Sequence, residues 1–166
     1  MRDLTLFRAM VGLPPAVNVL KGLKGPKGDS QSGFFIEKGH LMEYVELNSK
    51  RIISLFFGPG EFAIQCHPEF ANFQSLDDVA GGSLSHETVI RTLRKFPESF
   101  VHYREVRKLY YAKVAERLKV QEMPAEKRFE HLQKAQPWVF DLAQPKDIAC
   151  YLGISETIFE KIVGGH

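Results

Sequence analysis

The chain has 166 residues, of which 44% are hydrophobic and 25% charged, as is usual for a globular protein with a real core. Its net charge of +2 says little about its partners, and no apolar run reaches the roughly 20 residues of a membrane span. Two cysteines cannot build a disulfide framework or a cysteine-rich cluster, so we expect a cytoplasmic protein without a membrane partner.

The first 33 residues combine a short helix with a loop. Residues 1–17 carry apolar side chains at helical spacing, and Pro14-Pro15 ends that pattern. Residues 18–33 are typical of a short strand followed by an exposed loop rich in Lys, Gly, Pro and Ser. The glycines of residues 24–29 lack Walker spacing, so this segment is interpreted as a turn and not as a phosphate-binding loop.

Residues 34–85 alternate between short strands and turns. Aromatic and β-branched residues fill the strands, and turn signals such as Asn48-Ser49, Gly58-Pro59-Gly60 and Gly81-Gly82 separate them. The expected strands cover residues 34–37, 40–47, 50–57, 61–64, about 70–76 and 83–85. This spacing favours a sandwich or a jelly-roll barrel.

Helical periodicity replaces the strand pattern after Ser85. A helix is predicted to Phe96, and a longer one follows over residues 98–121, which contain neither Gly nor Pro. Because so long a helix seldom finds enough cover on a small β-domain, we predict that it pairs with a second copy of the chain. The expected seam consists of Tyr103, Val106, Tyr110, Val114 and Leu118. The alternative is that this stripe packs back on its own barrel.

Residues 147–163 have the pattern of two short helices joined by a tight turn. Gly153 is placed to end the first helix and Ser155 to cap the second. The apolar positions at helical spacing are Ile148, Ala149, Leu152, Ile158, Phe159 and Ile162. This layout predicts a helix-turn-helix, although an ordinary helical hairpin would produce the same pattern.

Several segments, in this order, resemble the Crp/Fnr family of bacterial transcription regulators. The matching segments are residues 34–39, 56–62, 74–78 with 84–87, 95–98 and the hairpin 148–155. The resemblance implies an α+β fold with a double-stranded β-helix, or jelly-roll, of the cyclic-nucleotide-binding type. It also implies three parts: a β-roll sensor with a short N-terminal helix (1–97), a long dimerisation helix (98–122) and a small DNA-binding-like domain (123–166).

The family pattern also places a ligand pocket in the β-roll. The implied pocket residues are Gly60, Glu61, Phe62, Ala63, Glu69, Phe70 and Ala71. Nucleotide-binding relatives hold the cyclic phosphate with an arginine, and Glu69 occupies that position in this chain. Because a carboxylate repels a phosphate, cyclic AMP or GMP is not expected to bind in the usual way. Two alternatives follow: the pocket is vestigial, or it holds a different effector, such as an apolar or cationic molecule.

The predicted reading helix has an unusual surface for DNA recognition. Its exposed positions are expected to be Ser155, Glu156, Thr157, Glu160 and Lys161, of which Lys161 alone is cationic. Positive charge lies upstream instead: residues 91–119 hold nine Lys/Arg against three Glu, whereas residues 124–166 hold five against six Asp/Glu.

The sequence therefore predicts a homodimeric Crp/Fnr-type regulator in which a ligand-sensing β-roll controls a helix-turn-helix on DNA. The rival hypothesis is a module of the same fold that has lost DNA binding, cyclic nucleotide binding, or both. No catalytic arrangement can be assigned, so we do not expect an enzyme. His67 and Glu69 lack the companion ligands of a metal site, so no metal is expected.

Overall fold

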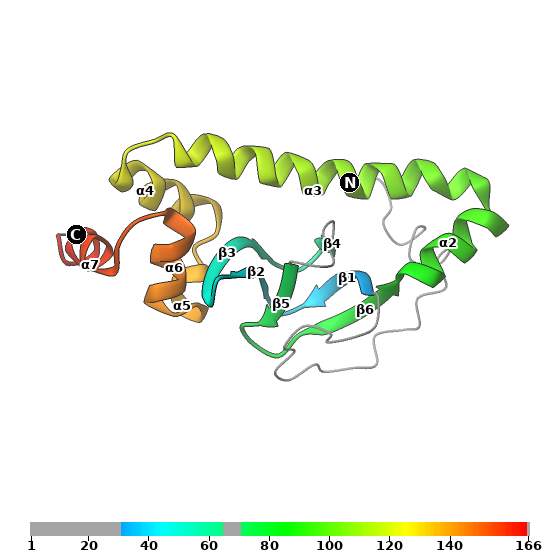
Figure 1. Cartoon of the computed structure of the whole chain (residues 1–166), viewed down its shortest axis with the longest axis horizontal. Coiled ribbons are helices and arrows are strands. Elements are labelled where there is room, and N and C mark those ends of the chain that lie inside the picture. The colour runs from blue at the N-terminus through cyan, green and yellow to red at the C-terminus, as the bar shows by residue number, and fades with distance from the viewer. Residues whose placement is uncertain (1–30, 65–70, 166) are drawn as a thin grey trace.

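The computed structural model describes residues 31–64 and 71–165 of the chain (Figure 1). The helix expected in residues 1–17, the loop that follows it up to residue 30, and Glu69 and Phe70 lie outside the described residues. Strands come first and helices follow, and the strands pair antiparallel, so the described part of the chain is an α+β protein.

The strands form two three-stranded antiparallel sheets, one in the order β4-β1-β6 and the other in the order β3-β2-β5. The strands are β1 (Gln31–Lys38), β2 (Leu41–Leu47), β3 (Lys50–Phe57), β4 (Phe62–Ile64), β5 (Ala71–Ser75) and β6 (Ala80–Ser85). Asn48 and Ser49, with φ of 50° and 62°, make the two-residue turn between β2 and β3. Each of the six strands overlaps a predicted one, but two boundaries were wrong. β1 begins at Gln31, inside the expected loop, and β6 begins at Ala80, so that Gly81-Gly82, expected as a turn, lie within the strand and pair with β1.

The helices follow the second half of the chain. They are α2 (His86–Lys95), the short 3₁₀ helix η1 (Pro97–Ser99), α3 (Phe100–Gln121), α4 (Ala125–Ala135), α5 (Val139–Leu142), α6 (Pro145–Leu152) and α7 (Glu156–Gly164). Ser85 caps α2, because its Oγ accepts a 3.0 Å hydrogen bond from the Thr88 backbone N–H. Among the described residues, no helix is both long and apolar enough to cross a bilayer.

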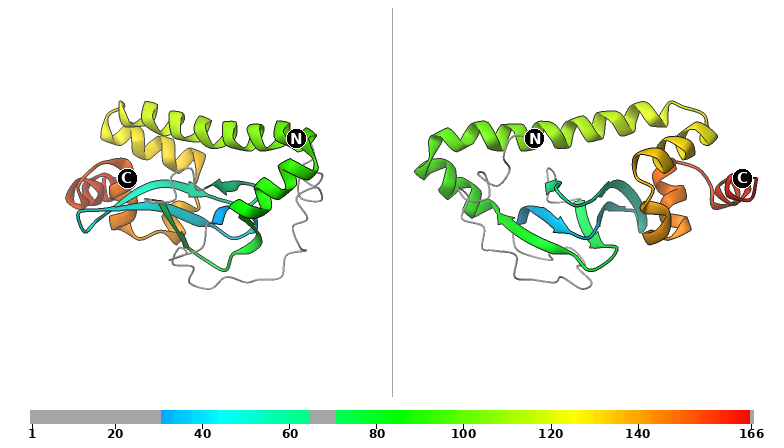
Figure 2. Two further views of the ribbon diagram at one scale, coloured as in Figure 1. Left: turned by 45° about the vertical axis from the view of Figure 1, so that its right-hand side comes forward. Right: turned by 180° about the vertical axis from the view of Figure 1, so that it is seen from behind.

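The long helix α3 spans the molecule. It lies across the open side of the sheets, with α2 at one end and the helices α4–α7 gathered at the other (Figure 1). The two further views show the same arrangement, with α7 at the end far from α2 (Figure 2). The helix α2, whose last turn carries Arg94 and Lys95, and the α6–α7 hairpin therefore lie at opposite ends of α3.

Two hydrophobic cores hold these elements together. The roll core lies between the two sheets and includes the inner face of α3, with Leu41, Leu55 and Phe73 among its buried members. The junction core lies on the other face of the β3-β2-β5 sheet, where Met42 and Phe56 pack with the helices α4–α7. Because strand side chains alternate between faces, β2 contributes to both cores, and its first four residues are all buried.

Candidate functional site

The predicted pocket glutamate is bonded to the long helix. One carboxylate oxygen of Glu61 accepts a hydrogen bond from the Gly58 N–H at 2.7 Å, and the other lies 2.6 Å from Lys113 Nζ on α3. Gly60, at φ +84°, makes the turn that precedes β4, and its N–H donates to the Ile36 carbonyl at 2.8 Å. The turn and α3 are therefore joined directly through Glu61.

Lys113 occupies a largely enclosed position in this pair. Its Nζ lies 4.8 Å from the centre of the Phe57 ring as well as beside Glu61. Burial lowers the pKa of Lys113, and the Glu61 carboxylate opposes that shift. Glu61 therefore uses one acceptor site on each carboxylate oxygen, for Gly58 and for Lys113, and a ribose hydroxyl would have to share the carboxylate with both.

The same face of α3 carries an arginine that bridges two other elements. Arg117 Nη2 donates to the Ile53 carbonyl of β3 at 2.8 Å and to the Tyr151 carbonyl of α6 at 3.4 Å. Its guanidinium also lies 4.9 Å from the centre of the Tyr151 ring. Burial lowers the pKa of Arg117 and raises that of Tyr151. Arg117 thus connects the long helix to both the sheet and the hairpin.

A buried carboxyl group lies on the sheet beneath α3. Glu43 of β2 is 1% exposed, and its cross-strand neighbours are Leu55 and Phe73. The Tyr110 hydroxyl donates to its two oxygens at 3.2 and 3.3 Å. Burial raises the pKa of Glu43 from 4.5 to about 7, although the Tyr110 hydrogen bond and the Arg117 charge both oppose this rise.

A cleft of about 470 Å³ lies between the Gly60 turn, α3 and the C-terminal helices. Its polar lining comes chiefly from Glu61, Tyr110, Lys113, Arg117, His131 and Tyr151. His131 on α4 lies 3.4 Å from the Glu116 carboxylate on α3. The cleft therefore touches β3, β4, α3, α4 and α6, so it lies against both the sheets and the first helix of the hairpin.

The structure distributes the predicted ligand-binding residues unevenly. Gly60, Glu61 and Phe62 line the cleft, whereas Ala63 is fully buried in β4 opposite Phe34 of β1. The backbone of Ala71 begins β5 and pairs with Val45, while Glu69 and Phe70 lie outside the described residues. These residues do not assemble as one pocket within the described part of the chain.

The cleft also fits a cyclic phosphate poorly. A phosphate needs a cationic donor fork that is free to bind it. Of the cations that line the cleft, Lys113 is paired with Glu61, and Arg117 donates to two backbone carbonyls. We therefore assign no role to a cyclic nucleotide in this cleft.

Most of the residues expected at a dimer seam face the chain's own core. Val106 and Tyr110 are buried in the roll core, and Tyr103 and Val114 pack against it. Leu118 is different, because 60% of its surface is exposed. The sequence periodicity identified a buried face of α3, but that face is covered by the chain's own sheets, as in the alternative stated above. A second copy would need the outward face of α3.

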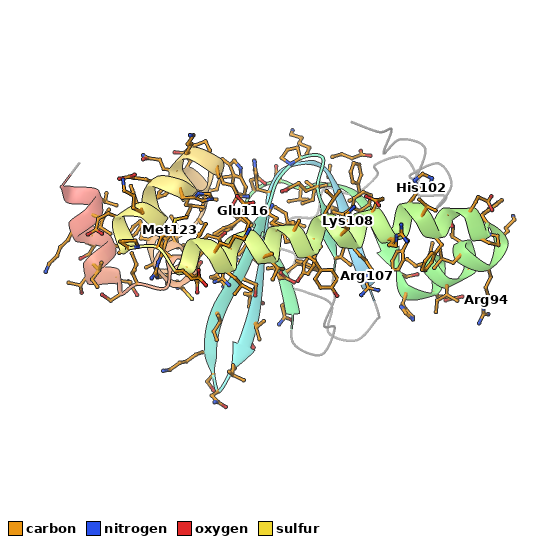
Figure 3. All side chains as sticks on the ribbon, turned by 90° about the horizontal axis from the view of Figure 1, so that it is seen from above. Arg94, His102, Arg107, Lys108, Glu116 and Met123 are labelled. Atoms are coloured by element: carbon orange, nitrogen blue, oxygen red, sulfur yellow. The ribbon has the colours of Figure 1, made fainter. Side chains whose placement is uncertain are left out.

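The outward face of α3 still carries large apolar side chains: helical spacing places Phe100, Tyr111 and Leu118 along one side of it, whereas Leu109 lies on the opposite side and lines the Glu61 cleft. Figure 3 looks onto this helix from the side away from the sheets, with Lys108 and Glu116 labelled along it and Met123 just beyond its C-terminal end. Arg107 stacks near Tyr111, at 5.6 Å from the ring centre, and its Nη2 donates to the Tyr111 hydroxyl. This face is both apolar and charged, as helix-pairing surfaces often are.

The predicted hairpin consists of α6 and α7 with a capped turn between them. Gly153 adopts φ +66°, and the Ile154 N–H donates to the Ala149 carbonyl at 3.0 Å, which ends α6 in a left-handed cap. Ser155 Oγ then accepts from the Ile158 N–H at 3.3 Å and caps α7. Both caps are at the residues chosen from the sequence.

The hairpin separates a buried face from an exposed one. Its buried side chains belong to the junction core and include Ile148, Ala149, Leu152, Phe159 and Ile162. The five residues expected to read DNA are all exposed, namely Ser155, Glu156, Thr157, Glu160 and Lys161. Ile158, expected on the buried face, is 45% exposed.

Hydrogen bonds also attach the hairpin to the rest of the chain. Cys150 Sγ lies between two backbone groups of β3, as it accepts from the Ile53 N–H at 3.4 Å and donates to the Arg51 carbonyl at 3.5 Å. Gln121 Nε2 of α3 donates to the Tyr151 carbonyl at 3.1 Å, and Arg128 of α4 donates to the Leu152 carbonyl at 2.7 Å. The first helix of the hairpin is therefore docked on the sheet.

Sequence reasoning missed Glu43, Lys113, Arg117 and this use of Cys150. For Glu43 a signal existed, because a carboxylate stands among the apolar residues Leu41, Met42 and Tyr44 of one strand. Arg117 and Lys113 gave no such signal, because basic residues on a long helix are usually solvated.

No protein-family model and no curated protein matches the chain. Solved structures do match its fold. A protein assigned to the Crp/Fnr family of transcriptional regulators, from Eubacterium rectale, is 9% identical with a TM-score of 0.71, over 97% of this chain and 82% of that one. FixK2 from Bradyrhizobium japonicum is 12% identical with a TM-score of 0.69, over 91% and 82%. The c-di-GMP responsive global regulator CLP from Xanthomonas campestris is 11% identical with a TM-score of 0.68, over 97% and 89%. The chain therefore has the fold of the Crp/Fnr regulators.

Proposed function

We propose that this chain, which has the Crp/Fnr regulator fold, is a homodimeric transcription regulator that binds DNA through α7 and responds to a small-molecule effector. The observation that carries the proposal is the division of the α6–α7 hairpin described above. Its apolar side chains are buried in the junction core, whereas Ser155, Thr157 and Lys161 remain exposed at one end of the molecule. A capped second helix with its polar face exposed at one end of the molecule is able to enter a DNA groove.

The surface of α7 makes recognition depend on sequence more than on charge. Ser155 and Thr157 lie at the N-terminal end of the helix, where hydroxyl and backbone N–H groups suit phosphate oxygens. Lys161 adds one cation, and Glu156 and Glu160 are acceptors suited to cytosine N4. Because few phosphates are neutralised, binding to unrelated DNA is weak.

The dimer in this proposal pairs the outward faces of two α3 helices. In the C-terminal half of that face, the proposed apolar contacts are Leu118, which is 60% exposed, and Tyr111, which is 45% exposed. A two-fold axis along α3 places the two α7 helices on successive turns of one face of a DNA duplex. In functional terms, residues 1–97 sense, 98–122 dimerise and 123–166 bind DNA.

The cleft beside Glu61 is the effector site of this proposal. A molecule that enters it contacts the Gly60 turn, α3 and α4 together. Displacing the Glu61–Lys113 pair would loosen the turn from the helix, and a contact near Arg117 would affect both β3 and α6. An effector shifts a regulator between two states when it binds one of them more tightly, and in this proposal the two states differ in the position of α3.

A specific observation favours one rival function. Glu156 and Glu160 place two carboxylates on the surface that would meet DNA, and α6 is docked on β3 of the same chain. These features fit a sensing module that keeps the hairpin as a helical cap and binds no DNA.

Selection of DNA from a random duplex pool, with the full chain at low salt, tests the two hypotheses. The proposal expects enrichment of a two-fold-symmetric sequence whose half-sites lie about one helical turn apart. The same selection with Lys161→Glu should enrich nothing. Arg94→Ala, on α2 at the end of the molecule far from α7, should enrich the same sequence. Absence of any enriched sequence with the unaltered chain overturns the proposal and supports the non-DNA-binding module.

A further inference from the structure

Glu43 stands out because it is an ionisable group in an otherwise apolar core. It is 1% exposed, and the roll core around it contains the buried side chains of Leu41, Leu55 and Phe73. The Tyr110 hydroxyl is its hydrogen-bond donor, at 3.2 and 3.3 Å. A carboxylate in such surroundings is costly unless a cation approaches it or it takes up a proton.

Arg117 is the cation that can respond. It lies two helical turns beyond Tyr110 on the same face of α3, and its positive charge acts on Glu43. In the structure its Nη2 is instead bonded to the Ile53 carbonyl and, at 3.4 Å, to the Tyr151 carbonyl of α6. Its Nε is buried and has no hydrogen-bond partner among the residues that the structure describes. The guanidinium thus lies between the buried carboxyl group and the hairpin.

We propose that the proton on the Glu43 carboxyl group decides whether Arg117 holds the C-terminal helices on the sheet, so that their docking responds to pH. When Glu43 is protonated, it carries no charge and Arg117 stays with the Ile53 and Tyr151 carbonyls. When Glu43 loses its proton to solvent, the carboxylate attracts the guanidinium, and the contact with Tyr151 is given up. The helices α6 and α7 are then held less firmly.

The groups that face Glu43 support this direction. From α3 these are the Tyr110 hydroxyl and the Arg117 charge, while β3 and β5 present the apolar Leu55 and Phe73. Tyr151 and Cys150 of α6 act on Arg117 and not on Glu43. Burial raises the pKa of Glu43 to about 7, so the change of charge falls close to neutral pH.

The arrangement also explains why the effect reaches the hairpin. Tyr151 belongs to α6, and its carbonyl is held by Arg117 and by Gln121, both from α3. The weaker of these contacts is the one that Arg117 gives up. The proposal does not depend on DNA binding, because it concerns only how the hairpin is docked.

Hydrogen exchange of the backbone amides of α6 and α7, measured on the full chain between pH 6 and pH 8, tests the proposal. After correction for the intrinsic dependence of exchange on pH, we expect protection to fall severalfold over this range. Release of Arg117 toward Glu43 lowers the pKa of that carboxyl group, and each unit of lowering changes the docking equilibrium by at most about tenfold.

Four variants make the test specific. Glu43→Gln should keep high protection at both pH values, and Glu46→Gln, an exposed glutamate on the same strand, should behave as the unaltered chain. Tyr110→Phe should move the midpoint to higher pH, because the lost hydrogen bond had lowered the pKa of Glu43. Arg117→Gln should lower protection at every pH. A fall in protection that survives Glu43→Gln, or no fall in the unaltered chain, overturns the proposal.

Discussion

At the scale of single residues, Glu43 makes stability depend on pH. Its pKa is about 7 in the folded chain against 4.5 for an unperturbed glutamate, so the folded state binds this proton more tightly than the unfolded state. The resulting stabilisation is complete below about pH 4.5 and is lost as the pH rises through 7. At its largest it amounts to about 3 kcal/mol, from the difference between the two pKa values.

We expect urea denaturation to show Glu43→Gln as more stable than the unaltered chain at pH 8, with the gap closing toward pH 5. Glu46→Gln should follow the unaltered chain at every pH, because Glu46 is exposed. If the free energy of unfolding depends on pH in the same way for the two variants, the pKa of Glu43 is not raised by its burial.

Residue roles divide sharply into those that the sequence could predict and those it could not. Gly153 and Ser155 were predictable, because their effects are local. Glycine can adopt the positive φ that ends a helix, and the serine hydroxyl accepts from a backbone N–H three residues later. Glu61 was identified as a pocket residue, but its partner Lys113 is 52 positions away and was not. A pairing over that separation depends on how α3 lies on the sheets, which local pattern does not contain.

At the scale of elements, the turn between α6 and α7 depends on one glycine. Gly153 has φ +66°, and a Cβ there would lie 3.2 Å from Arg128 Nη1 as well as in a strained backbone region. Gly153→Ala should therefore lower stability by about 1–2 kcal/mol. Gly164→Ala is the matched control, since a Cβ there meets nothing within 4 Å and alanine favours a helix. Equal melting temperatures for the two variants would contradict this view of the turn.

Element prediction succeeded where periodicity and turn chemistry act together. Strands β2 and β3 flank Asn48-Ser49, and α6 and α7 flank Gly153, so each pair was visible from its turn. For α3 the buried stripe was correctly located, yet periodicity cannot say what covers a stripe. The sheets of the same chain cover it, and the expected seam residue Leu118 stays exposed.

At the scale of the whole molecule, the junction core links the sheets to the hairpin. Met42 and Phe56 of one sheet pack with Phe129, Ile148 and the other helices in a single buried cluster. This core could not be predicted, because the local pattern of each contributing segment shows that it has an apolar face but not which other segment covers that face. A change at the sheets can therefore reach α7 through packed side chains as well as through α3.

Dimerisation through the outward face of α3 gives a prediction at the same scale. Leu118→Glu should convert the dimer to a monomer in sedimentation equilibrium, because it buries a charge in an apolar seam. The fold should persist, since Leu118 is 60% exposed within one chain. Leu47→Glu, at a 53% exposed leucine at the end of β2, is the matched control and should leave the mass unchanged. A dimer that survives Leu118→Glu would place the interface elsewhere.

The central claim is that α7 binds DNA, and the salt dependence of binding tests it most directly. The affinity for the enriched duplex should be measured over a range of salt concentrations for the unaltered chain, Lys161→Ala and Arg94→Ala. We expect log Kobs to fall linearly with log salt, with the slope reduced by about one for Lys161→Ala, which loses one phosphate contact, and unchanged for Arg94→Ala. Figure 3 shows Arg94 at the opposite end of the long helix. Absence of salt-sensitive binding, or a slope that changes with Arg94 and not with Lys161, would contradict the account.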